Sequence, residues 1–144
     1  MTLDRKVKNM FDFILKKKSG FDLIKKNLES QYPEMIFQSS KIKIWVYEER
    51  AQHYFKIASI YRNEWINFKH LKTLITGIKY QTDLLTADDP LFFKNNLKLI
   101  EQYMSKEKIS VTIERIDSML TKRANEKWGP TLDDLKKSSN SADL

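Results

Sequence analysis

The chain has 144 residues and no cysteine, so it is long enough for one domain with a core and has neither disulfide frameworks nor thiolate zinc sites. Hydrophobic residues at 41% and charged residues at 31% exclude a generally disordered chain. The net charge of +7 favours a polyanionic or acidic partner, and no apolar run suits a signal peptide or a membrane span. We therefore expect a cytoplasmic protein that does not associate with membranes.

Two short helices are predicted at the N-terminus. Thr2 can cap a first helix over residues 3–18, where apolar side chains recur every three or four positions as far as residue 15. Gly20 suits the left-handed residue that ends a helix, and a second helix is expected between residues 22 and 33. Three cations that complement the helix dipole precede this end, namely Lys16, Lys17 and Lys18.

Residues 40–76 are expected to form one long helix. Ser40 can cap its start, and Gly77 is placed to end it. Side chains in this stretch follow one another at alternating steps of three and four, as on one stripe of a helix. They are Ile44, Tyr47, Ala51, Tyr54, Ala58, Tyr61, Trp65, Phe68, Lys72 and Ile75. A rod of about 55 Å also allows a homo-oligomer to form through the long helix.

Part of the same region fits a different structure. Residues 35–37 and 42–46 have the apolar content of two short strands. In the second range Ile42, Ile44 and Val46 occupy every second position, as in a strand. We prefer the helix because Ser39 and Ser40 lack the positive φ angles that two-residue hairpin turns favour. Whether residues 35–47 are helix or a short hairpin is left open.

The C-terminal half carries clear helix signals. Asp89 followed by Pro90 is typical of a helix start, and helical spacing continues through residues 90–127. The apolar stripe changes phase near Ser105, which leaves open one helix or two and favours a break or kink. Gly129 and Pro130 stop the last helix, and residues 130–144 are expected to form a flexible tail.

These elements together predict an all-α fold of four to five helices. The architecture is a long helical hairpin or bundle with an N-terminal helical pair packed on it. Residues 1–129 form a single helical domain in this prediction.

The sequence offers little catalytic chemistry. His53 and His70 lie too far apart on the expected helix to share a metal, and no phosphate loop, metalloprotease or nucleophile-elbow motif occurs. We therefore expect no enzyme, no catalytic residue, no metal site and no cofactor.

Aromatic residues interleaved with cations suggest a binding role instead. Tyr54, Tyr61 and Trp65 alternate with lysine and arginine, as in proteins that stack single-stranded bases, although their regular spacing is more typical of a core. Four aromatic residues outside the main stripe are freer to stack, namely Trp45, Tyr80, Tyr103 and Trp128.

Two functions are consistent with these observations. The first is a non-enzymatic, basic accessory protein that binds nucleic acid. Its expected phosphate contacts are Lys16, Lys17, Lys18, Arg62, Lys69, Lys72, Lys122 and Arg123. The alternative is a protein-interaction module, such as an inhibitor, immunity or scaffold protein, that binds an acidic protein. Lysines gathered on one face would favour nucleic acid, and mixed charge around an apolar groove would favour a protein.

Overall fold

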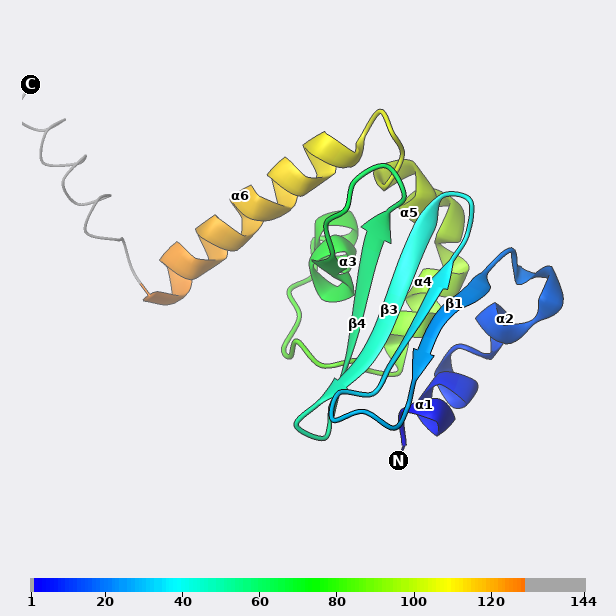
Figure 1. The fold of residues 1–144 in the computed structure, drawn as a ribbon. Helices are drawn as coiled ribbons and strands as arrows, with labels where there is room; N and C mark the ends of the chain where they lie inside the picture. Colours follow the sequence, from blue (N-terminus) through cyan, green and yellow to red (C-terminus); the bar gives the residue numbers. More distant parts are fainter. Residues whose placement is uncertain (1, 129–144) are drawn as a thin grey trace, which may run out of the picture.

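The computed structural model describes residues 2–128 and shows a five-stranded sheet with helices (Figure 1). The strands are β1 (Asp22–Asn27), β2 (Glu34–Gln38), β3 (Ile42–Glu49), β4 (Gln52–Ser59) and β5 (Ile66–Asn67). The helices are α1 (Leu3–Met10), α2 (Asp12–Leu15), the 3-10 turn η1 (Lys17–Ser19), α3 (Phe68–Thr76), α4 (Asp88–Asn95), α5 (Leu97–Tyr103) and α6 (Ile109–Trp128).

The sheet is an antiparallel meander. Its spatial order is β1-β2-β3-β4-β5, so every strand pairs with its neighbour in sequence. The central pair β3 and β4 is the longest, with eight residue pairs in register from Ile42 opposite Ser59 to Glu49 opposite Gln52. β1 forms one edge, is exposed along its whole length and carries a bulge between Leu23 and Lys25.

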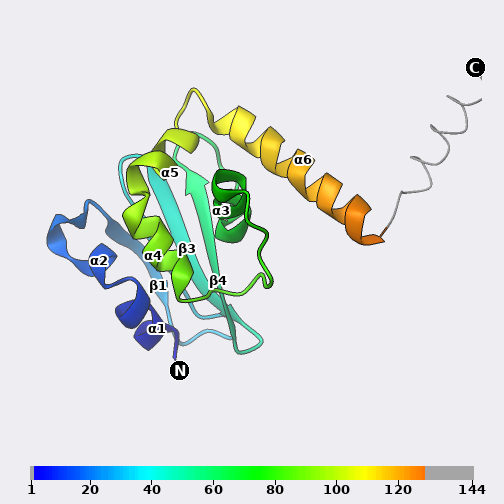
Figure 2. The same cartoon turned by 180° about the vertical axis from the view of Figure 1, so that it is seen from behind.

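Helices α1, α3 and α4 cover one face of this sheet (Figure 2). Because side chains alternate along a strand, every second residue of the central strands points into this layer. These buried residues are Met35, Phe37, Ile42, Ile44, Val46, Phe55 and Ile57.

Phenylalanines form the centre of the core. The side chain of Phe93 in α4 is fully buried, and its ring centroid lies 5.7 Å from that of Phe55 and 5.8 Å from that of Phe68. The rings of Phe55 and Phe68 stack at 4.5 Å, and Phe11 meets Phe55 edge-on at 5.0 Å. This cluster joins the sheet to α3, α4 and the N-terminal helices.

The prediction of an all-α bundle is wrong. Residues 40–76 contain β3, β4, β5 and α3 in place of one long helix, and residues 35–47 adopt the hairpin that was the alternative. The apparent helical stripe arose because both faces of β3 and β4 carry apolar side chains, so that polar residues do not mark the period of two. The homo-oligomer was expected to form through the long helix, and residues 40–76 do not form that helix.

The β2–β3 turn explains why the hairpin was missed. Ser39 closes it through its side chain, whose Oγ accepts hydrogen bonds from the backbone N–H groups of Lys41 and Ile42 at 3.2 Å each. A hydroxyl group therefore provides the closure that positive φ angles would otherwise provide.

The expected N-terminal helical pair is also only partly right. Thr2 caps α1, since its Oγ1 accepts from the N–H of Arg5 at 3.4 Å, and Gly20 has a φ of 81°. The expected first helix is not continuous, because breaks at Phe11 and Lys16 divide it into α1, α2 and η1. The predicted second helix is instead strand β1, because its apolar residues lie along a strand edge and make no helical stripe against the core.

Some boundaries are confirmed. Gly77 ends α3 with a φ of 74°, and a break at Ser105 separates α5 from α6. Asp89 and Pro90 lie in the first turn of α4, but the N-cap is Ala87 and not the expected Asp89. A further break at Asn96 separates α4 from α5, so residues 90–127 form neither one helix nor two. The expected tail at 130–144 lies outside the described residues. None of the described helices has the length and apolar character required to cross a membrane.

Candidate binding groove

The face of the sheet opposite the helices carries aromatic and basic side chains. This open face is formed by Lys43, Trp45, Tyr47, Tyr54, Lys56 and Trp65. Strand alternation places them there, because their neighbours Ile44, Val46 and Phe55 point into the core. Within the described chain no helix crosses the middle of this face (Figure 1).

The rings of the open face contact one another across strands. Tyr47 and Tyr54 are paired residues of β3 and β4, and their rings stack at 5.1 Å with an angle of 15° between planes. The ring of Trp45 lies 4.4 Å from that of Tyr47 and 5.4 Å from that of Trp65. The cross-strand pair Tyr47–Tyr54 stabilises the antiparallel sheet, and the further contacts of Trp45 extend the aromatic surface.

Two lysines lie over these rings. Lys56 Nζ is 5.6 Å from the ring centroids of both Trp45 and Tyr47, and Lys43 Nζ is 5.5 Å from that of Trp65. Both distances fall within the range of cation–π attraction.

Helix α6 turns one side of the open face into a groove of about 390 Å³. Tyr47, Tyr54 and Trp65 form the sheet side of this aromatic groove. The α6 side consists of the apolar residues Ile113, Ile116 and Leu120 together with Asp117. Four charged side chains also line the groove, namely Lys56, Glu64, Asp83 and Asp117.

The charges in the aromatic groove are predominantly negative. Three carboxylates face one lysine, and burial lowers the pKa of the lining residue His70 below its usual 6.5 although Asp83 opposes the shift, so His70 is neutral at pH 7. Glu64 Oε2 lies 3.0 Å from Arg62 Nε, whereas no described residue forms an ion pair with Asp117. A basic chain thus presents an acidic, aromatic groove.

Two of the sequence-predicted phosphate contacts are occupied inside the protein. Lys69 is 5% exposed, and its Nζ lies 2.8 Å from Asp89 Oδ2 and 2.6 Å from Thr86 Oγ1. Lys72 pairs with Asp88 and lies 3.2 Å from Asp89 Oδ1. These contacts clamp the start of α4 onto α3, which gives both lysines a structural role.

The two arginines among the candidates also have partners. Arg62 forms the ion pair with Glu64 described above. Arg123 Nη2 donates to the backbone oxygen of Tyr80 at 3.0 Å, and its guanidinium lies 4.0 Å from the Tyr80 ring centroid. Tyr80 is thereby covered, although the sequence suggested that it is free to stack.

The remaining candidates are exposed but far apart. Lys16, Lys17 and Lys18 follow α2, whereas Lys122 lies in α6, and these two helices lie on opposite sides of the sheet (Figure 1). The structure therefore does not bring the eight predicted residues into one patch.

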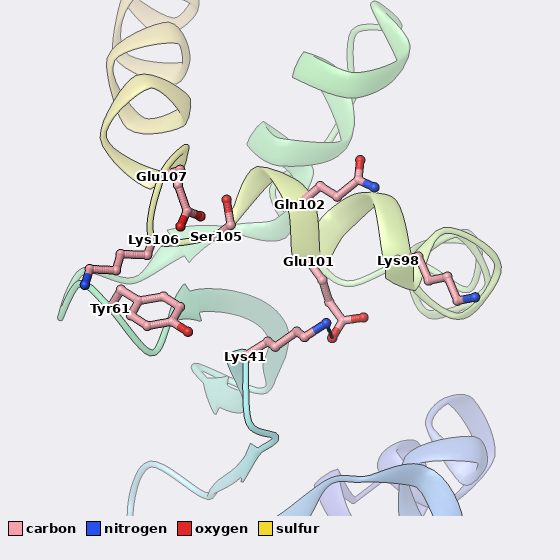
Figure 3. A pocket seen from close by; sticks show the side chains of 8 residues that line it. All are labelled: Lys41, Tyr61, Lys98, Glu101, Gln102, Ser105, Lys106 and Glu107. Atoms are coloured by element: carbon pink, nitrogen blue, oxygen red, sulfur yellow. Dashed lines mark ion pairs between the residues drawn. The ribbon is translucent and has the colours of Figure 1, made fainter.

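A second hollow of about 450 Å³ lies at the end of the sheet near the α5–α6 turn (Figure 3). Its side chains include Lys41, whose Nζ is 3.9 Å from Glu101 Oε2, and the exposed Tyr61. In Figure 3, Lys98 and Lys106 extend toward opposite sides, so their charges do not converge on one ligand. The aromatic groove has the more convergent lining.

Sequence reasoning found part of the groove. Tyr54, Trp65 and Trp45 were considered for stacking, but the acidic residues Glu64, Asp83 and Asp117 were not connected with them. Only the folded chain brings these carboxylates together, because they belong to the β4–β5 loop, the α3–α4 loop and α6.

No group of three or more potential metal-ligating residues occurs within residues 2–128. The inner face holds one buried histidine, His53, whose Nε2 lies 3.0 Å from Glu48 Oε1. No family model matches the chain, and comparison with curated proteins and with solved structures found no match either.

Proposed function

We propose that this protein is a protein-interaction module that holds a segment of a partner protein in the aromatic groove. The observation that carries the proposal is the groove itself: an aromatic and aliphatic cleft with charges of both signs at its rim. Tyrosine and tryptophan are the residues that most often dominate binding energy at protein interfaces, since they bury large area with few rotatable bonds.

The charge distribution supports a protein partner over nucleic acid. Arg62, Lys69, Lys72 and Arg123 already have intramolecular partners, which removes half of the expected phosphate contacts. Phosphates would also meet the three carboxylates that line the groove.

Capture from an extract of the organism that encodes the chain tests this function. The extract is treated with nuclease and passed over the immobilised protein. We expect a protein that is retained by the wild type and lost with Tyr54→Ala/Trp65→Ala. Tyr61→Ala is the matched control, because Tyr61 is an exposed aromatic residue, 53% accessible, outside the groove. Equal retention by all three proteins would contradict the proposal.

Nucleic-acid binding is the second candidate, and the exposed run Lys16, Lys17 and Lys18 favours it. None of these lysines has an ion-pair partner among the described residues. A charge reversal of all three to glutamate should lower affinity for DNA or RNA and reduce the salt slope by about one unit per lost phosphate contact. Absence of binding at low salt would exclude this candidate.

A further inference from the structure

The aromatic groove has the chemistry of a cation site. Its sheet side consists of electron-rich rings, and carboxylates come from three separate elements around it. A chain with net charge +7 has an excess of cations on its surface, yet three carboxylates and a single lysine line this groove. Of the three, Glu64 also pairs with Arg62 at 3.0 Å, whereas Asp117 has no ion-pair partner among the described residues. Rings attract a cation through their negative faces, and nearby carboxylates add Coulomb attraction.

The protein's own side chains already use these rings in this way. Lys56 lies over Trp45 and Tyr47, and Lys43 lies over Trp65. Tyr54 and Trp65 line the same groove as Asp117 and Glu64, and no lysine other than Lys56 is among the lining residues.

We propose that the groove binds a lysine or arginine side chain of the partner segment, clasped between Tyr54, Trp65 and the carboxylates of Glu64 and Asp117. This inference rests on the proposed function and names the chemistry of the partner. A cavity of about 390 Å³ lies near the lower end of ligand pockets, which span roughly 300–1,000 Å³, and suits one long side chain with its adjoining backbone.

Other occupants fit less well. An acidic segment, which the net charge of the whole chain favours, would meet the three carboxylates at close range. A purely apolar segment would bury Asp117, which has no ion-pair partner among the described residues, and this carries a desolvation cost. A cationic side chain with a long aliphatic stem satisfies both the rings and the acids.

Selection from a phage-displayed library of random dodecapeptides tests the inference directly. We expect the retained peptides to share a lysine or arginine at one position and to lose binding to Tyr54→Ala/Trp65→Ala. A selected peptide is then synthesised with arginine at that position and again with citrulline, which keeps the shape and removes the charge. The citrulline peptide should bind roughly tenfold more weakly.

Variants of the protein supply the complementary test. Asp117→Asn should weaken binding of the arginine peptide about twofold to fivefold, and adding Glu64→Gln should weaken it further. Glu114→Gln is the matched control, since Glu114 is an exposed carboxylate of α6 that does not line the groove, and it should leave affinity unchanged.

Failure of the inference and failure of the proposed function give different results. The inference is overturned if the selected peptides bind through Tyr54 and Trp65 but show no preference for lysine or arginine. That result would not contradict the proposed function as an interaction module. Equal affinity for the arginine and citrulline peptides, or selection of no groove-dependent peptide, would also overturn it. The proposed function fails separately, if the groove variant captures the same proteins as the wild type.

Discussion

Replacement of Lys69 by methionine should destabilise the fold strongly. Methionine keeps the length of the side chain but leaves Asp89, which is 1% exposed, without its nearest cation at 2.8 Å. Removal of one partner from a buried ion pair costs about 3–5 kcal/mol. Asp89 retains the contact with Lys72 at 3.2 Å and accepts from the backbone N–H of Thr86 at 3.1 Å, so we expect a loss of about 3 kcal/mol.

Urea denaturation followed by circular dichroism measures this effect. With a slope of about 2 kcal/mol per molar urea, a loss of about 3 kcal/mol lowers the midpoint by about 1.5 M. Lys98→Met is the matched control, because Lys98 is exposed, and it should change stability by less than about 0.5 kcal/mol. If Lys69→Met lowers the unfolding free energy by less than about 1 kcal/mol, the structural role of the Lys69–Asp89 pair is refuted. Lys69 would then again be a candidate for ligand contact.

Three further predictions concern the core, a turn and the response to acid. Phe93→Ala should cost about 3–5 kcal/mol in unfolding free energy, because it empties the centre of the aromatic core; a loss under about 1.5 kcal/mol would contradict that packing. Arg50→Asn/Ala51→Gly should raise the unfolding free energy by about 1 kcal/mol, since both residues have positive φ (53° and 62°). The control Ser40→Asn/Lys41→Gly should give no such gain. Hydrogen bonds from Lys72 and Thr86 lower the pKa of Asp88 from 3.8 to about 2, so its stabilisation should be present above pH 4 and lost as pH falls toward 2. Asp88→Asn should flatten the pH dependence of unfolding in that window, and an unchanged profile would count against the contact.

The sequence was informative where a local signal acts alone. Thr2, Gly77 and Pro90 act through caps, left-handed angles and a missing N–H group, which need no knowledge of the rest of the chain. These signals marked helix boundaries to within two residues, and the change of phase in the apolar stripe marked the break near Ser105.

Strand signals failed because two causes coincided. The alternation in residues 42–46 was visible, but Trp45, Tyr47 and Tyr54 place apolar surface on the side of the sheet that usually carries polar residues, so that an apolar stripe at helical spacing was also present. Arg50 and Ala51 then make the β3–β4 turn with left-handed angles although neither is glycine, asparagine or aspartate. The same aromatic residues that disguised the hairpin now form the candidate groove, so the departure from the usual pattern coincides with the proposed site.

The charged candidates failed for a different reason. Net charge identifies lysines but gives no information about their partners, and Asp89 lies 20 positions after Lys69 in the chain. Only the fold brings this pair together at the junction of α3 and α4.

The meander order of the sheet has a consequence for how the chain folds. Because each strand pairs with the one before it, every sheet contact closes only a short loop, and the entropy lost at each step is small. The β3–β4 hairpin can form first, and β2 and β5 can then add to its two sides without threading the chain. Chains with such local pairing fold faster than those whose neighbouring strands are distant in sequence. Phe11 and Phe93 contact Phe55 from 44 and 38 residues away in the chain, so the packing of the N-terminal helices and α4 on the sheet closes longer loops than any strand pairing does.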